Sequence, residues 1–170
     1  MVAPASDQLG ARPCEDAELF AERLPAGARL IGIDLGSKTL GLALSDVTRT
    51  IASGLTTLQR GKFTADVARL LELGATHGVG GLVIGLPKSL DGLEGRRAQA
   101  TRAFARNLSK HTSLPILLWD ERFSTAAAER VLIEADSSRR QRAAVIDKVA
   151  ATLILQAALD RMQRRLTEGP

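Results

Sequence analysis

Residues 30–46, LIGIDLGSKTLGLALSD, decide the fold. They contain two apolar runs, 29–36 and 40–46, separated by a short turn of sequence GSK, which is typical of two buried strands joined as a hairpin. The runs show no polar alternation, so they indicate a sheet that is covered on both faces. Asp34 stands inside the first run, where a charge costs free energy unless something compensates it. The hairpin therefore predicts a buried carboxylate with a partner.

Outward from the hairpin, apolar runs and helical spacings alternate along the chain. The pattern predicts a third strand over 52–59, a helix over 62–77, a strand over 81–87, a helix over 96–111, a strand over 114–121, a helix after Ser124 or Thr125, a polar loop over 136–142 and a long helix over 144–166. Three strands followed by strand–helix alternation predict a mixed sheet in an α/β layer fold.

Residues 1–28 differ in composition from the rest of the chain. Three prolines interrupt them, and only residues 15–24 have helical spacing. They hold five acids and two bases, a net charge of −3. Since the overall charge is +4, residues 29–170 carry a net charge of +7. We expect a partly disordered tail over 1–28 and a single domain over 29–170.

Composition narrows the classes of function. No apolar run reaches the roughly 18 residues that span a membrane, and the N-terminus lacks the pattern of a signal peptide, so a cytoplasmic protein without membrane contact is expected. Cys14 is the single cysteine, which excludes an internal disulfide. The basic body favours nucleic acid as partner. One tryptophan, no tyrosine and four scattered phenylalanines predict no aromatic platform, and hence binding through phosphates and shape.

Four acids stand out by position. Asp34 lies within the first strand, Asp120 and Glu121 end the last strand, and Asp147 lies at the edge of the apolar stripe of the last helix. Singly, each has an ordinary explanation: Asp120 pairs with Arg122, or Asp147 is favoured by the helix dipole. Together, on a chain without histidine or cysteine clusters, they predict a site of hard oxygen ligands for Mg²⁺ or Mn²⁺.

Four separated motifs carry a family resemblance. IGIDLGSKTLGLALSD, VIGLPKSLDG, DERFST and DKVAATLIL occur in the order found in the YqgF/RuvX family, and the resemblance covers residues 29–166. It implies an RNase H-like fold with a five-stranded mixed sheet, three antiparallel strands first, flanked by helices. Residues 1–28 have no counterpart in the family pattern. That family comprises bacterial proteins described as Holliday junction resolvases or as nucleases of pre-16S rRNA.

The resemblance also implies roles for particular residues. Asp34, Glu121 and Asp147 would be catalytic, and the same three with Asp120 would hold one or two divalent ions, with Glu121 the favoured ligand of the acidic pair. Phosphate contacts are expected from Lys38, Lys88, Arg122, Arg139, Arg140 and Arg142. Basic runs are more often solvated faces, and a salt bridge to a neighbouring acid is an equal alternative for Arg122.

The function expected from these features is metal-dependent hydrolysis of phosphodiester bonds. Precursor 16S rRNA is the favoured substrate and branched DNA the alternative. Symmetric cutting of branched DNA would need a dimer and processing of rRNA would not, so both a monomer and a homodimer are open. A non-catalytic module that binds nucleic acid or the ribosome is a second alternative. A phosphotransferase of the actin-like and sugar-kinase type would share the Asp-x-Gly turn, but it needs two such halves, and 170 residues supply one.

Overall fold

A mixed five-stranded sheet forms the centre of the domain. The computed structural model describes residues 12–124 and 139–168, with the backbone alone over 139–144. The strands are β1 (Arg29–Leu35), β2 (Thr39–Ser45), β3 (Ala52–Gln59), β4 (Val79–Leu86) and β5 (Ile116–Asp120). They lie in the order β3-β2-β1-β4-β5; β1, β2 and β3 are antiparallel, and β4 and β5 run parallel to β1. The predicted RNase H-like sheet, with three antiparallel strands first, is confirmed.

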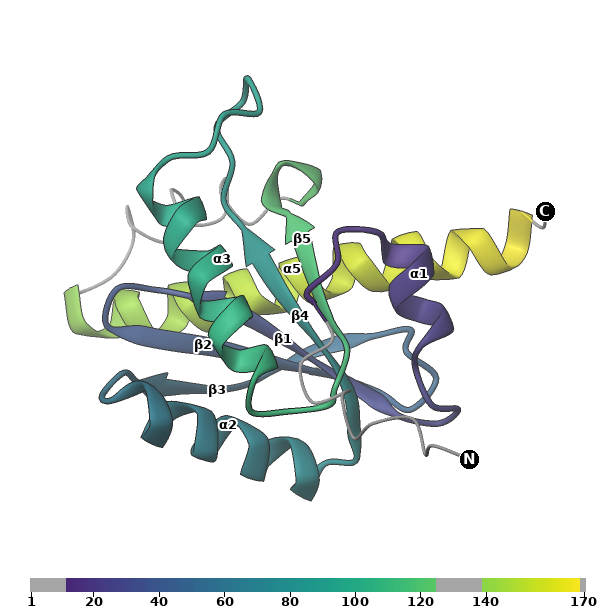
Figure 1. Ribbon diagram of the computed structural model, residues 1–170, viewed down its shortest axis with the longest axis horizontal. Coiled ribbons are helices and arrows are strands. Elements are labelled where there is room, and N and C mark those ends of the chain that lie inside the picture. Colours follow the sequence, from purple (N-terminus) through teal and green to yellow (C-terminus); the bar gives the residue numbers. More distant parts are fainter. Residues whose placement is uncertain (1–11, 125–138, 169–170) are drawn as a thin grey trace, which may run out of the picture.

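Helices cover both faces of this sheet (Figure 1). The helical segments are α1 (Ala17–Glu22), α2 (Phe63–Thr76), α3 (Arg96–Ser109), the 3-10 turn η1 (Glu121–Phe123) and α5 (Arg139–Glu168). Helices α2 and α3 pack on one face, and α5 crosses the other. The site described below lies on the face that α5 covers.

Each face of the sheet has its own apolar core. Ile31 and Ile33 of β1 belong to the core under α2 and α3. Leu30 belongs to the core under α5, together with Ile154 and Leu155 of that helix. Because successive side chains of a strand point to opposite faces, the even-numbered positions of β1 face α5.

The segment ahead of β1 packs against the domain. Asp16 caps α1 by accepting hydrogen bonds from two backbone N–H groups of its first turn. Phe20 is fully buried in the core under α5. Cys14 exchanges two backbone hydrogen bonds with β5, of 2.9 and 2.7 Å. The expected tail over 1–28 therefore includes, from Cys14 onward, part of the folded unit, while residues 1–11 lie outside the described part.

The last helix begins earlier than its sequence pattern predicts. It starts at Arg139, within the polar stretch 136–142 that predicts a loop. Arginine and glutamine are polar but good helix formers, so polarity alone does not mark a loop there. The helix predicted after Ser124 falls on residues 125–138, outside the described residues. None of the helices that the structure describes is long and apolar enough to cross a bilayer.

Replacing Phe20 with alanine should lower the free energy of unfolding by about 3–5 kcal/mol, because removing a buried aromatic ring leaves a cavity. Urea unfolding followed by circular dichroism measures the change. Leu19→Ala is the matched control on the same helix, since Leu19 is 40% exposed and should cost about 1 kcal/mol or less. Equal losses in the two variants would contradict the packing of α1.

Candidate active site

Asp34 lies in β1 between glycines of the two neighbouring strands. Only 2% of its surface is exposed. Gly41 of β2 is its cross-strand partner, and Gly85 of β4 stands one residue beyond the partner of Ile33. Asp34 lies four residues after Leu30 in the same strand, so its side chain points to the same face as Leu30, the α5 face. The two glycines leave space on either side of this carboxylate.

Asp147 of α5 fills the space over Gly41. A Cβ at Gly41 would lie 2.0 Å from the carbonyl oxygen of Asp147 and 2.8 Å from its Cβ. A Cβ at Gly36, in the turn after β1, would lie 3.2 Å from the Asp147 carboxylate. The hydroxyl of Thr39 donates a short hydrogen bond to that carboxylate. Asp147 thus reaches the sheet because glycine occupies both facing positions, and Thr39 holds its side chain.

Glu121 fills the space over Gly85 in the same way. It is the first residue of η1, directly after β5, and is 7% exposed. A Cβ at Gly85 would lie 2.7 Å from Glu121 Oε1 and 2.4 Å from the side chain of Ile154 in α5. The Glu121 carboxylate therefore lies on the α5 face over β4, next to the position of Asp34 in β1.

The structure thus brings Asp34, Glu121 and Asp147 to one face of the sheet, at the C-terminal end of β1. All three contribute carboxylate oxygens, the donors that Mg²⁺ and Mn²⁺ prefer. Within the described part of the chain, no three His, Cys, Asp or Glu side chains are arranged to coordinate an ion as they stand. The donor chemistry fits a hard divalent ion, and holding one requires the side chains to adjust from these positions.

Asp120 is placed away from this group. Trp119 packs in the core under α5, so Asp120 points toward the opposite face. Its carboxylate accepts hydrogen bonds from Nε and Nη2 of Arg122, at 3.0 and 2.6 Å, and from the backbone N–H of Arg122. Burial alone would raise the pKa of Asp120, but the bonds and charge of Arg122 outweigh burial and hold that pKa below its usual value. Of the acidic pair, Glu121 is the member that faces Asp34.

Some of the side chains expected to bind phosphate form ion pairs with acids of the protein. Lys88 Nζ lies 3.6 to 3.9 Å from the carboxylates of three acids. Arg122 forms the salt bridge to its neighbour Asp120, as its alternative role predicts. Lys38 is exposed in the turn between β1 and β2.

The arginine cluster before Asp147 belongs to α5 in the structure. Arg139, Arg140 and Arg142 lie in its first turns rather than in a loop. Their side chains lie outside the described residues, so their contact with phosphate stays a prediction.

Two polar residues at the site have no distinctive pattern in the sequence. Thr39 opens β2 and resembles an ordinary strand residue, yet its hydroxyl binds Asp147. Arg60 follows β3, and its guanidinium donates to the carbonyl oxygen of Gly36 at 2.6 Å, which places a cation beside the same turn. Only the pairing of β2 with β3 brings Arg60 there, and a single sequence does not show that pairing directly.

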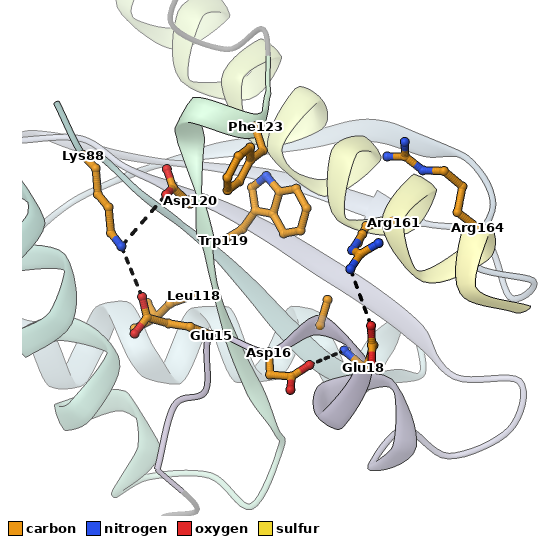
Figure 2. A pocket seen from close by; sticks show the side chains of 11 residues that line it. Glu15, Asp16, Glu18, Lys88, Leu118, Trp119, Asp120, Phe123, Arg161 and Arg164 are labelled. Carbon is orange, nitrogen blue, oxygen red and sulfur yellow. Dashed lines mark hydrogen bonds and ion pairs between the residues drawn. The ribbon is translucent and has the colours of Figure 1, made fainter. Parts of the chain in front are cut away.

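Two aromatic side chains that are separated in the sequence meet beside the site. Trp119 is the last residue but one of β5 and Phe123 ends η1, and their rings pack edge to face with centroids 6.3 Å apart (Figure 2). The 3-10 turn reverses the chain after Asp120 and returns Phe123 to Trp119. The expectation of scattered aromatic residues does not hold for this pair.

Comparison of the sequence with known families and proteins shows one family. The family model described as "RuvX: Holliday junction resolvase" matches residues 28–161. A protein of Paracoccus denitrificans named "Putative pre-16S rRNA nuclease" is 57% identical over 150 residues, which cover 88% of this chain and 95% of the relative. A protein of the same name from Methylocella silvestris is 55% identical over 156 residues, covering 92% and 96%. The "Thermus thermophilus RuvC structure" aligns with a TM-score of 0.48 and 15% identity over 80% of this chain and 97% of that chain.

These alignments also reach the N-terminal segment. Residues 29–170 number 142, so a match over 156 residues must include residues ahead of β1. The family model begins at residue 28, in agreement with the expectation that residues 1–28 have no counterpart in the family pattern, but part of this segment has a counterpart in the relatives. This agrees with the packing of α1 on the domain.

Replacing Gly41 with alanine should displace α5, because the new Cβ would lie 2.0 Å from a backbone oxygen that cannot rotate away. The free energy of unfolding should fall by about 1–3 kcal/mol, the usual cost of overpacking. Gly61→Ala is the control, since its Cβ would have only Asp66 Oδ1 nearby, at 3.9 Å. Urea unfolding of both variants measures the difference, and equal stability would contradict the close approach of Asp147.

Proposed function

Since the chain belongs to the RuvX family, whose model spans residues 28–161, we propose that it is a nuclease that hydrolyses phosphodiester bonds with a bound divalent ion. The observation that carries this proposal is the grouping of Asp34, Glu121 and Asp147 on one face of the sheet, with a glycine facing each of the last two. A module that only binds nucleic acid gains nothing from buried carboxylates that face phosphate, so this grouping favours catalysis over binding alone.

Mg²⁺ or Mn²⁺ is the proposed cofactor, held by Asp34, Glu121 and Asp147. When bound, such an ion activates a water molecule and stabilises charge on the leaving oxygen of a phosphodiester. The chain itself supplies the placement: β1 keeps Asp34 away from bulk water, and Thr39 orients Asp147. Asp120, which caps η1 through the backbone N–H of Arg122, positions Glu121 and is not assigned as a main ligand.

Precursor 16S rRNA is the proposed substrate, because the relatives that are more than half identical carry that activity in their name. Branched DNA is the second candidate, because the matching family model is described as a resolvase. Cutting an RNA end needs one copy of the chain, and acting on rRNA would place it in the cytoplasm. Symmetric cleavage of a junction needs a two-fold dimer. Lys38, Arg139, Arg140 and Arg142 are proposed to contact the phosphate backbone of either substrate.

A side-by-side digestion tests the choice of substrate. A four-way DNA junction and a 5′-extended 16S rRNA precursor are each incubated with the protein and Mg²⁺ or Mn²⁺. We expect cleavage of the RNA. Cleavage of the junction alone would reverse the assignment, and cleavage of neither would contradict the nuclease function.

Asp34→Asn should slow cleavage by more than about 100-fold, because even residues behind the metal ligands typically contribute 10- to 100-fold. Binding of the same substrate should persist or tighten, since a negative charge that faces phosphate is removed. Asp160→Asn is the matched control on the exposed side of α5, where Asp160 accepts a hydrogen bond from Gln156 at 2.9 Å. Cleavage by Asp34→Asn at the rate of the unmodified protein would refute the catalytic assignment.

Mn²⁺ should raise the melting temperature, because an ion that binds only the folded state stabilises it. At a concentration a hundredfold above Kd the gain is about 2.7 kcal/mol, or roughly 5–10 °C for a domain of this size. Asp34→Asn should lose most of this rise and Asp160→Asn should keep it, as followed by differential scanning fluorimetry. No rise in the unmodified protein at millimolar Mn²⁺ would contradict binding of the ion by these carboxylates.

A further inference from the structure

A groove of about 940 Å³ runs along the outer edge of β5, between the start of α1 and the last turns of α5 (Figure 2). Its volume falls in the range of about 300–1,000 Å³ that is usual for ligand sites. Trp119 and Phe123 lie at its centre, and charged side chains lie toward both ends. The groove is large enough for a nucleotide, and its lining combines two aromatic side chains with four acids and three cations.

The aromatic pair presents an open ring to the groove. Phe123 is 69% exposed, although large apolar side chains favour burial. Trp119 supports it from below through the edge-to-face contact, and the guanidinium of Arg122 lies 5.8 Å from the Phe123 centroid. These contacts fix the orientation of an exposed ring, which is the arrangement that stacking of a nucleic-acid base requires.

The acids along the groove are already engaged. Asp16 caps α1, and Glu15, Glu18 and Asp120 each form an ion pair with a lysine or an arginine. Their negative charges are therefore largely compensated within the protein. The same ion pairs engage Lys88 and Arg161, so Arg164 is the described cation of the lining that remains for a phosphate.

Cations stand at both ends of the groove. Lys88 lies at the end near β4, and Arg161 and Arg164 project from α5 at the other (Figure 2). Among the described residues, Arg164 donates only to the main-chain oxygen of Asp160, at 3.4 Å. Its guanidinium therefore retains donors for a phosphate.

The groove adjoins the candidate active site through β5 and η1. Glu121 precedes Phe123 by two residues, and its carboxylate lies over Gly85, which pairs with Trp119. A nucleic-acid strand with a phosphate at Glu121 can thus continue over Phe123 and Trp119 toward Arg164.

We propose that this groove binds a single-stranded stretch of nucleic acid next to the bond that is cut, with one base stacked on Phe123, whose ring Trp119 supports, and a flanking phosphate on Arg164. The proposal rests on the nuclease function proposed above, because it assigns the form of substrate at the same site. Stacking accepts any base, since every base has a π-face. A base inside a duplex is already stacked on its neighbours, so a duplex does not use this surface.

Binding measured in EDTA, where no metal-dependent cleavage occurs, tests the groove. The probes are a short single-stranded oligoribonucleotide and the duplex of the same sequence, each fluorescently labelled for anisotropy. Phe123→Ala should weaken binding of the single strand by roughly 5- to 150-fold, the usual contribution of one stacked base, and leave duplex binding within about twofold. Phe123→Tyr, which keeps the ring, should restore binding of the single strand.

A matched variant and an intrinsic probe complete the test. Ile51→Ala removes a side chain that is 61% exposed in the turn between β2 and β3, and it should change neither affinity. Trp119 is the only tryptophan in the chain and lies against Phe123, so its fluorescence reports on a base bound at that ring. The single strand should quench this fluorescence and the duplex should not.

Two results would overturn the proposal: equal weakening of single strand and duplex by Phe123→Ala, or no effect of this substitution on either. These results are distinct from a failure of the nuclease function, which the cleavage assay of Asp34→Asn decides. A protein that binds single strands through Phe123 but does not cleave supports the groove and refutes the nuclease. A protein that cleaves but keeps its single-strand affinity in Phe123→Ala supports the nuclease and refutes the groove.

Discussion

A carboxylate buried within a central strand constrains the whole α5 face of this protein. Asp34 is 2% exposed, and a charge so placed destabilises the fold unless neighbouring groups compensate it. At the positions around Asp34 that face α5, β1 and its two neighbouring strands carry glycines rather than apolar side chains. Gly32, Gly41 and Gly85 all face α5, and a Cβ at any of them would lie within 3 Å of an atom of that helix. The helix therefore lies unusually close to the sheet, and this closeness brings Asp147 to Asp34.

Much of this arrangement could be predicted from the sequence, and the exceptions have identifiable causes. The hairpin, the mixed sheet with three antiparallel strands first and the three grouped carboxylates follow from apolar runs, the glycine turn and the family motifs. The separate placements of Asp120 and Glu121 could not be predicted from spacing, because strand alternation ends at Asp120 and a 3-10 turn begins at Glu121. The same turn explains the contact between Trp119 and Phe123, which alternation along an extended strand would not predict.

Charge is the property that the sequence describes least well. Residues 29–170 carry a surplus of bases, yet several of the described cations near the site are engaged by acids. Arg102 binds Glu94 and Glu15, and these contacts raise the pKa of its guanidinium further above its ordinary value. Two of the acids that pair with these bases, Glu15 and Glu18, come from the N-terminal segment. A count of charges along the chain therefore overestimates the cations that remain available to phosphate.

The one-residue bridge between Cys14 and Leu117 has a consequence for how two such sheets could meet. An outer strand with unpaired backbone groups is a template for pairing with another chain. The bridge occupies the middle of β5, and α1 then turns the chain away over the α5 side, so β5 cannot accept a full-length neighbour. The opposite boundary, β3, has eight residues, and among the described residues no strand lies beyond it in the sheet. Backbone pairing between the sheets of two copies is therefore expected at β3 and not at β5, the edge strand beside the carboxylates. This holds for native assembly and for aggregation alike.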